Sequence, residues 1–535
     1  MITDSFQPAQ CIVTAAALTL VFYIVPYLLD PYDYRRRFSG PPLAAFTNWW
    51  MSSLIRAGHH NETVYKLHEQ YGTFVRLGPN HVSIADPDAL ETVYGHGSGL
   101  LKSEFYRIFV NGETDVFSTD NKVEHAHKRK RLANIFSPQN VLAFEPRVRD
   151  HIRELCAQWD LRCKQAARGV SGANWTAQNE MAVIDVSAQF PYLTFDIIGD
   201  LALGSSFGLI QAQKDSSPAI ESVDASGVPM NTSLEIPVVS TIAKAGGMCV
   251  AVGYFPSWAH KFLQLLPWNL AGGLKMMSFM KLTKISVDAR IKRGPRTTKD
   301  GRTSVDLIEK LLAVKNKDGT PLAAEELYAE AFVLLLAGSD TTSHTMSSVC
   351  YFLAVHPEAQ QKLQAELDQH IPYDTAEEIE EKRDNLAVPP VEAVVQYEQI
   401  KSLPYLNACI KEAMRLYSTV GTGLPRVVPK GKAVTIAGQL FREGSVISVP
   451  SYTTNRSSVW GSDAGEFRPE RWLGDNVESL NKYFVPFSIG SSNDFFVRAC
   501  IGRNLAYMNL LLITASVFRR YEVKALPTTK VNVFF

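Results

Sequence analysis

The residue with the most distinctive chemical setting is Cys500, which lies between glycine-containing stretches near the end of the chain. The segment 487–490 (FSIG) precedes it, and the segment 498–503 (RACIGR) leads into an apolar stretch, 505–518, that predicts a helix. A helix N-terminus offers unpaired N–H groups and a partial positive charge, which favour a thiolate over a thiol. Glycines let the backbone approach a flat ligand closely. The alternative is a buried cysteine that only fills space.

A lone thiolate limits which metal the site could hold. Zinc needs about four protein ligands or three and a water, so one cysteine is a poor zinc site. The same thiolate suits the axial position of a haem iron, where it donates electron density that favours O–O cleavage. The setting of Cys500 therefore indicates haem more than zinc.

A second chemical group lies in the middle of a long helix predicted over residues 322–355. Small and polar residues occupy positions 337–342 (AGSDTT), where serine and threonine can take hydrogen bonds from the helix and glycine weakens it, so we expect a local opening. Asp340 beside Thr341 forms an acid–alcohol pair that can pass protons into a cavity. We expect Thr320 to cap this helix, with a proline next to it at the first helical position. The alternative is a helix with one polar turn.

A third group combines a helix predicted over residues 402–418 with a later loop. Glu412 and Arg415 are three apart and share one face of that helix. Arg471, in the segment 467–472 (FRPERW), could join them in a network of three charges. The alternative is a surface ion pair worth a few tenths of a kcal/mol.

A basic helix is predicted from residue 125 onward, in the segment 125–131 (HAHKRKR). His125 and Arg129 are one turn apart and could hold the carboxylates of a haem. The HxH pair also resembles a metal site, but no further histidine or cysteine cluster supports zinc there. The other basic residues could contact an acidic protein partner.

Composition excludes one large class of function. The 535 residues include 54 basic and 54 acidic side chains, so the formal net charge is zero, which argues against a nucleic-acid-binding protein. The cysteines number seven and are scattered without a CxxC pair, which is typical of a reducing compartment.

The N-terminus predicts a membrane anchor. Residues 11–29 carry no charge and approach the ~20 residues that a membrane helix needs. Three arginines follow at positions 35–37, and the positive-inside rule places them in the cytosol. A cleaved signal peptide is the alternative, but its basic residues would precede the apolar stretch.

The predicted organisation is an anchor over residues 1–30, a basic and proline-containing hinge over 31–45, and one large domain over 46–535. Helical periodicity dominates from about residue 141, so the fold class is mainly α with a small β region. We expect strands at 74–76 and 81–84, joined as a hairpin, and at 433–436 and 446–449.

Four sequence features in this order resemble the cytochrome P-450 monooxygenases. They are HxxxR at 125–129, AGSDTT at 337–342, ExxR at 412–415 with PERW at 469–472, and RxCxG at 498–502. Further stretches are similar to the fungal benzoate 4-monooxygenase group, and they lie at 71–76, 80–87, 199–202 and 423–426.

The resemblance implies a mostly helical prism, haem b (iron protoporphyrin IX) and electrons from an NADPH–cytochrome P-450 reductase. It also implies a single-pass protein of the endoplasmic reticulum membrane with a cytosolic catalytic domain. Carried over residue by residue, the resemblance implies that Cys500 is the axial iron ligand and that Asp340 and Thr341 deliver protons. It implies a structural network of Glu412, Arg415 and Arg471. It also implies contacts to the haem propionates from four basic residues, which are His125, Arg129, Arg426 and Arg498.

The chain departs from the pattern of the family in three places. Thirteen positions separate Phe487 from Cys500 where the family has seven, so about six residues, 492–497, are extra. Only 35 residues follow Cys500, whereas the family continues through a further hairpin. Asn509 stands where the family often has glutamate.

We therefore expect an enzyme that inserts one oxygen atom from O2 into an apolar or aromatic small molecule, in aromatic-acid metabolism or a secondary-metabolite pathway. A catalytically impaired haem-binding relic is the alternative that the insert and the short C-terminus raise, and a scaffold without cofactor is a third. Lys102 and Arg107 are candidates to hold a substrate carboxylate, and the region 109–121 is expected to differ from the benzoate group.

Overall fold

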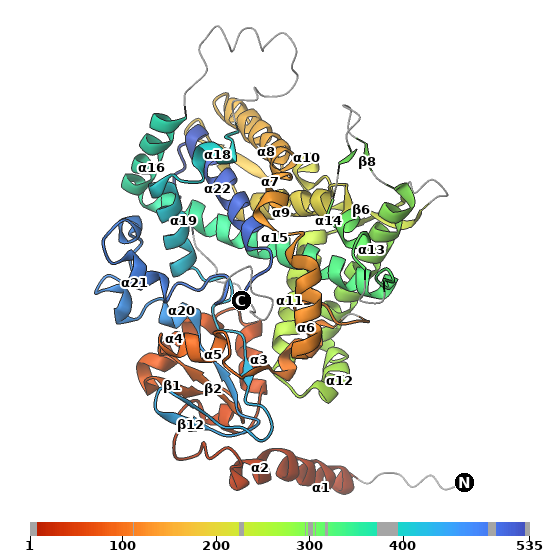
Figure 1. Cartoon of the computed structure of the whole chain (residues 1–535), viewed down its shortest axis with the longest axis vertical. Helices are drawn as coiled ribbons and strands as arrows, with labels where there is room; N and C mark the ends of the chain where they lie inside the picture. The colour runs from red at the N-terminus through yellow and green to blue at the C-terminus, as the bar shows by residue number, and fades with distance from the viewer. Residues whose placement is uncertain are drawn as a thin grey trace.

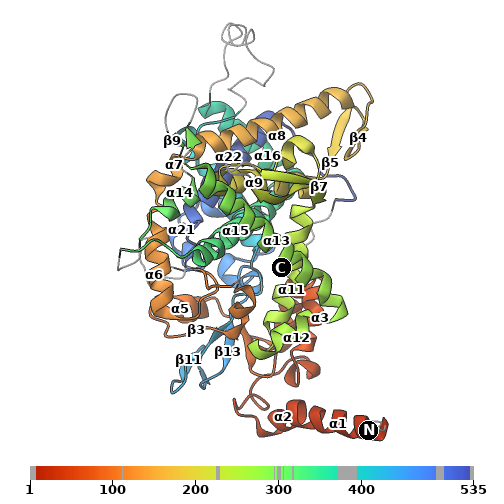
Figure 2. The same cartoon turned by 90° about the vertical axis from the view of Figure 1, so that its right-hand side faces the viewer.

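The computed structural model describes residues 8–110, 112–223, 229–294, 296–297, 303–304, 306–315, 319–371, 394–489 and 499–529. The described chain forms a helical body with a small β region at one end, and the N-terminal helix lies beyond that end (Figures 1 and 2). The long helices of the body are α4 (His60–Tyr71), α6 (Lys122–Ala133), α8 (Glu145–Ala166), α9 (Val186–Leu203), α11 (Val238–Gly253), α13 (Pro267–Arg293), α15 (Ala324–Val355), α16 (Pro357–His370), α19 (Pro404–Leu416) and α22 (Arg503–Arg520). The shorter α-helices are α3 (Trp49–Arg56), α5 (Ala89–Tyr94), α7 (Pro138–Leu142), α10 (Leu209–Ala212), α12 (His260–Gln264), α14 (Leu307–Leu312), α18 (Tyr397–Ile400), α20 (Ser451–Thr454) and α21 (Val477–Asn481).

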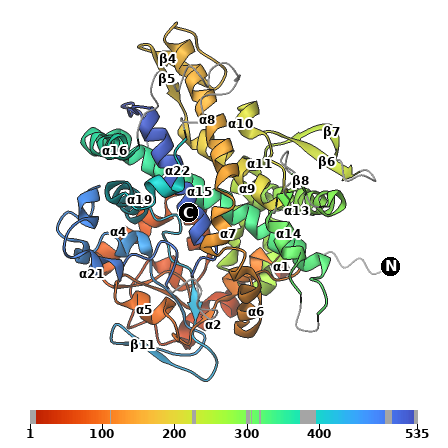
Figure 3. The same cartoon turned by 45° about the horizontal axis from the view of Figure 1, so that its top comes forward.

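Helix α15 runs through the centre of the body, between α9 and α22 (Figure 3). A Cβ atom added at Gly338 would lie 2.8 Å from the Ile198 side chain of α9, so the glycine is what lets the two helices come so close. Most of the apolar side chains of α9, α15 and α22 belong to one large apolar core or pack against it. This packing holds α15 rigidly across the molecule, which fixes the position of the AGSDTT segment.

The start of α15 differs from the sequence-based expectation. The helix begins at Ala324, and its N-cap residue is Ala323 with no side-chain cap, so neither Thr320 nor Pro321 has the predicted role. The expected opening at 337–342 is absent, since the helix is continuous there. The Oγ atoms of Ser339 and Thr341 donate to carbonyls four residues earlier, at 2.6 and 2.8 Å, which satisfies them without breaking the helix.

The β region is a five-stranded sheet in the order β1 (Phe74–Arg76), β2 (His81–Ile84), β13 (Val446–Ser448), β10 (Arg426–Val427) and β3 (Leu101–Lys102). The predicted hairpin of β1 and β2 is confirmed. The two later strands do not pair with each other. Strand β13 lies parallel to β2, while β11 (Val434–Ile436) forms its own hairpin with β12 (Gln439–Phe441). Two-stranded hairpins elsewhere are β4 (Trp175–Gln178) with β5 (Met181–Ile184), β6 (Ser217–Val223) with β7 (Pro229–Ile236), and β8 (Arg296–Thr297) with β9 (Thr303–Ser304).

The N-terminal helix has three consecutive parts, α1 (Pro8–Thr19), the π-helical turn η1 (Leu20–Ile24) and α2 (Val25–Leu29). Its 18-residue window Ile12–Leu29 has a mean hydropathy of 2.2 and is long and apolar enough to cross a membrane. Asp30 ends the helix in a left-handed conformation (φ 43°), and its carboxylate accepts hydrogen bonds from the N–H groups of Tyr34 and Arg35.

Candidate functional site

Cys500 lies directly before α22, as the sequence predicts. Its N–H donates to the carbonyl of Phe487 at 2.8 Å, so the two residues that flank the extra segment 492–497 are joined by a hydrogen bond. Residues 490–498, which include the extra segment and Arg498, lie outside the described residues. The side chain of Cys500 is exposed.

Although the Cys500 side chain is exposed, the protein packed around it desolvates the thiol and raises its pKa, and the N–H groups of Gly502 and Arg503 and the positive charges of Arg129 and Arg503 partly offset that rise. The expectation that the helix end alone favours a thiolate is therefore incomplete. A metal cation bound at the sulfur would shift Cys500 to the thiolate form, because a coordinating thiol is deprotonated.

The middle of α15 has an open face. Ala337 is exposed and Asp340 and Thr341 are partly exposed, although residues 331–335 and 342–343 on either side are buried. Adjacent α22 carries Cys500 at its head and packs against α15. Between its buried stretches the helix therefore presents small residues and a hydroxyl that are open to solvent, as a flat group seated against it would require.

Asp340 has a partner that the sequence did not single out. His344, one turn later, places Nδ1 2.8 Å from the carbonyl of Asp340 and 3.5 Å from its carboxylate. Burial lowers the pKa of His344, but the hydrogen bond and charge of Asp340 outweigh burial, and the net shift is upward. The spacing of four residues on a helix is a signal that could have found this pair.

A basic side chain of α6 contacts the Cys500 loop. Arg129 donates from Nη1 to the carbonyl of Ala499 at 2.6 Å, and His125 is buried one turn earlier on α6. Arg426, on strand β10, donates to the hydroxyl of Tyr106. Arg498 lies outside the described residues, so the structure describes three of the four residues that the resemblance implies for the propionates, and their contact with propionates stays a prediction.

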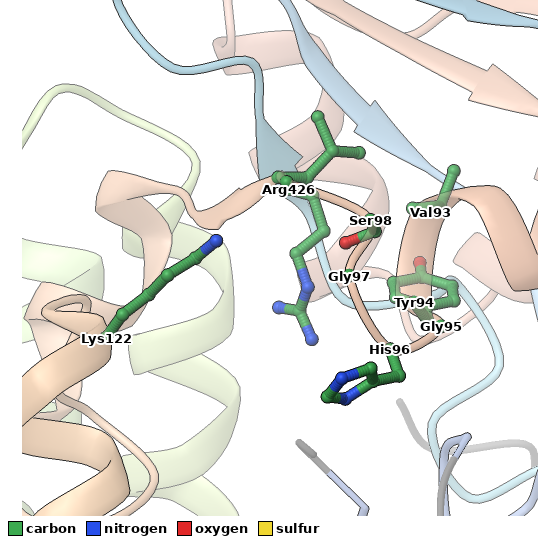
Figure 4. Close-up of a pocket in the computed structure, with 10 residues that line it drawn as sticks. Val93, Tyr94, Gly95, His96, Gly97, Ser98, Lys122 and Arg426 are labelled. Atoms are coloured by element: carbon green, nitrogen blue, oxygen red, sulfur yellow. The ribbon is translucent and has the colours of Figure 1, made fainter. Parts of the chain in front are cut away.

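Arg426 also lines a small cavity of about 50 Å³ that two other basic residues share (Figure 4). Lys122 reaches it from the first turn of α6, and His96 reaches it from the glycine-rich loop after α5. Sequence reasoning missed both residues, because their approach to Arg426 depends on the packing of three separate segments.

The ExxR group forms a buried network. Arg415 donates to both carboxylate oxygens of Glu412, at 2.9 and 2.7 Å, and Arg471 donates to Glu412 at 3.2 Å. Trp472 adds an indole N–H at 2.9 Å, which the sequence analysis did not anticipate. Glu412 and Arg415 are fully buried, so the alternative of a surface ion pair is wrong.

These donors fit a haem. An exposed thiol precedes α22, which packs against the helix that carries the open face, and the buried Arg129, a side chain suited to a carboxylate, contacts the residue before that thiol. A bound haem would supply oxygen activation, and the chain would hold its iron through Cys500 and its propionates through His125, Arg129 and Arg426.

Comparison with known proteins decides the family. The sequence model of cytochrome P-450 matches residues 39–535. The chain belongs to the cytochrome P-450 family. It is 36% identical to benzoate 4-monooxygenase of Aspergillus niger, over 95% of this chain and 90% of that protein. It is 28% identical to pisatin demethylase of Fusarium vanettenii, over 96% of this chain and 89% of that protein.

Solved structures support the same fold. A crystal structure of a cytochrome P-450 superposes with a TM-score of 0.64 at 18% identity, covering 88% of this chain and 94% of that one. The predicted fold class, mainly α with small sheets behind one apolar N-terminal helix that is long enough to span a membrane, is confirmed.

One departure of this P-450 from the family pattern falls on a described residue. Asn509 lies within α22 and is 4% exposed, and its Oδ1 has no hydrogen-bond partner among the residues that the structure describes.

Neither candidate for a substrate carboxylate is placed to bind one. Lys102 donates to the backbone carbonyls of Val116 and Phe117, while Arg107 pairs with Asp120 at the surface.

Proposed function

We propose that this P-450 is a haem-thiolate monooxygenase. It inserts one oxygen atom of O2 into a C–H bond of an apolar or aromatic small molecule and reduces the other atom to water, using two protons and two electrons from NADPH through a reductase. The observation that carries the proposal is Cys500 at the head of α22, the helix that packs against α15 with its open face. Asp340 and Thr341 on that face are the residues that we assign to proton delivery.

The substrate that we propose is an aromatic acid or a secondary metabolite with an aromatic ring. The relatives named for benzoate and pisatin support this class. The aromatic side chains of Phe105, Phe109 and Phe117 pack against one another, directly or through Tyr106, and provide a surface suited to a ring. Since Lys102 and Arg107 are engaged elsewhere, a carboxylate on the substrate would need a different partner from those two.

We place the protein in the endoplasmic reticulum membrane, with its body in the cytosol. The apolar N-terminal helix supports an anchor. A surface on α12 and α13 supports a second contact, because large apolar side chains are exposed there, among them Phe262 at 70% and Met277 at 66%. Helix α12 lies toward the end of the body where α1 and α2 lie (Figures 1 and 2).

Spectroscopy of the purified protein tests the reaction class. The reduced protein with carbon monoxide should give the Soret band of a thiolate-ligated haem, and Cys500→Ala should abolish that band. Cys163→Ala, which changes an exposed cysteine away from the site, should leave it intact. A protein that carries no haem, or one whose band survives Cys500→Ala, contradicts the proposal.

Activity assays separate a monooxygenase from the relic alternative. Spectral shifts on binding should occur with aromatic acids or ring-containing metabolites, followed by NADPH-dependent product with a reductase. If the wild-type chain binds haem but makes product only after deletion of residues 492–497, the relic reading holds. We expect product from the wild-type chain.

A further inference from the structure

His344 lies on the open face of α15, two positions beyond the AGSDTT segment. With 3.6 residues per turn, His344 points about 40° from Asp340 and about 60° from Thr341, so it lies between them on the helix surface. The side chains of His344 and Asp340 are 24% and 23% exposed, whereas residues 342–343 and 345–346 are buried. His344 therefore shares this face with the two residues that we assign to proton delivery.

The contacts of the imidazole ring show where one of its protons lies. Nδ1 of His344 is 2.8 Å from the carbonyl oxygen of Asp340. Because a carbonyl oxygen can only accept, Nδ1 carries a proton, and Nε2 is the atom that gains or loses one as the ring titrates. Nδ1 also lies 3.5 Å from the Asp340 carboxylate, just beyond a regular hydrogen bond. A small rotation of either side chain would bring this donor and this acceptor together.

The acid and the alcohol on this face need a source of protons. The hydroxyl of Thr341 donates its proton to the carbonyl of Ala337 at 2.8 Å, so that proton is already engaged. Asp340 lies beside His344 as the acidic partner of an ion pair. A carboxylate that delivers protons repeatedly has to be reloaded after each delivery, and His344 is the titratable side chain in contact with it.

Asp340 also controls the acidity of the ring. Burial lowers the pKa of His344, but the hydrogen bonds and the charge of Asp340 outweigh burial and raise the pKa above its ordinary value of 6.5. Helices α9, α13, α16, α19 and α22 pack against α15, and none of the titratable groups described on them contributes to this shift. Within the described part of the chain, the charge of His344 therefore depends on Asp340.

We propose that His344 is a positioning residue that acts through Asp340, because the charged ring holds the carboxylate on the open face and reloads it with a proton. In the transfer the Nδ1–H bond breaks and an O–H bond forms on the carboxylate, which leaves a neutral Asp340 and a neutral ring with its proton on Nε2. After Asp340 has passed its proton on, a proton from solvent returns to Nδ1. This inference rests on the proposed monooxygenase function, which consumes the protons.

Histidine NMR of the haem-loaded full chain tests the pairing without turnover. The reduced carbon monoxide complex is diamagnetic, and His344→Gln assigns the resonance of His344 among the 12 histidines by its loss. In wild type we expect the pKa of His344 to lie above 6.5, and in Asp340→Asn below 6.5, because burial remains while the charge is removed. A titration of His344 that is the same in both proteins overturns the proposal.

The pH profile of turnover separates proton supply from a structural contact. His344→Asn keeps an N–H group that can bind the Asp340 carbonyl, but asparagine does not titrate. We expect kcat of wild type to fall as pH rises above 6.5 through the pKa of His344. In His344→Asn, kcat at low pH should be at least about tenfold lower, without that fall and with KM unchanged. A profile of His344→Asn that equals that of wild type overturns the proposal, even if Asp340→Asn fails to fold.

His356, at the end of the same helix, provides the matched control. Its Nδ1 donates to the carbonyl of Phe352 at 2.8 Å, which is the same contact four residues back but with an uncharged partner residue. His356→Asn should keep the wild-type rate and pH profile, and a loss as large as that of His344→Asn contradicts a role for the Asp340 charge. A wild-type chain that forms no product refutes the proposed function instead, and the NMR titration still decides whether Asp340 controls the proton of His344.

Discussion

At the scale of single residues, the ExxR network shows how a buried charge depends on every partner. Glu412 lies between Arg415 and Arg471, and all three side chains are almost fully inaccessible. Each arginine has further backbone acceptors. Arg415, for example, donates to the carbonyls of Asn455 and Ala464. The network thereby joins α19 to the loop around residues 455–472.

We predict that Glu412→Gln lowers the free energy of unfolding by about 3–5 kcal/mol, because the buried guanidinium group of Arg415 loses its countercharge and that of Arg471 keeps only Asp463. Chemical denaturation followed by tryptophan fluorescence would measure the loss. Lys362→Met is the matched control, since it removes an exposed ion pair with Glu470 and should cost less than ~1 kcal/mol. A loss for Glu412→Gln no larger than that of the control would show that the network contributes little to stability.

The sequence identified the residues that act through local spacing. Cys500 before an apolar stretch, and Glu412 with Arg415 at three residues, are visible in a linear chain because their partners are near in sequence. His96 and Lys122 were not visible, because each approaches Arg426 across segments that the fold brings together.

At the scale of elements, local pattern predicted which segments are regular better than it predicted their partners. Both strands of the first hairpin were found, because a Gly-Pro-Asn turn sets their pairing. Strand β13 was found, but its parallel partner β2 lies more than 350 residues earlier, and no local signal specifies such a pairing. The cap of α15 was misplaced because threonine and proline near a helix start are compatible with more than one first residue.

The contact between α8 and α9 predicts a pH dependence of stability. Arg147 donates to the Asp200 carboxylate at 2.9 and 2.7 Å, and His151 approaches it within 3.4 Å. Burial alone would lower the pKa of His151, but Asp200 and Glu154 outweigh it and raise the pKa to about 9. Because the folded state binds this proton more tightly, its contribution is complete below about pH 6.5 and is lost as pH rises through about 9.

We expect wild type to lose on the order of 3 kcal/mol of unfolding free energy from this group between about pH 6.5 and 9.5. In His151→Gln that part of the loss should vanish, since glutamine has no proton to release. Denaturation curves at several pH values would measure it, with His59→Gln, a change at an exposed histidine beside Glu62, as the control. Parallel curves for wild type and His151→Gln would contradict the assignment.

At the scale of the whole molecule, charge and exposure combine on the side that carries the anchor. The surface of α12 and α13 exposes Phe262, Leu265, Trp268 and Met277. Between Glu235 and Asp288 the chain has five lysines and no acidic residue, although the protein as a whole is neutral. Exposed tryptophan and phenylalanine among lysines are typical of helices that lie in the interface of an anionic membrane.

We therefore predict that a chain without residues 1–30 still binds lipid vesicles that contain anionic phospholipid, and that salt weakens this binding. Burial of one large apolar side chain contributes about 1.5–3 kcal/mol, so changing Phe262, Trp268 and Met277 together to serine should reduce the partition coefficient at least a hundredfold. Vesicle co-sedimentation would measure the coefficient. Leu161→Ser changes an exposed leucine of α8, a helix at the other end of the body from α1 and α2 (Figure 1), and should leave the coefficient unchanged. If the triple variant binds as well as the control, a different surface of the body holds the shortened chain to the vesicles, and the lysine-rich surface serves another purpose.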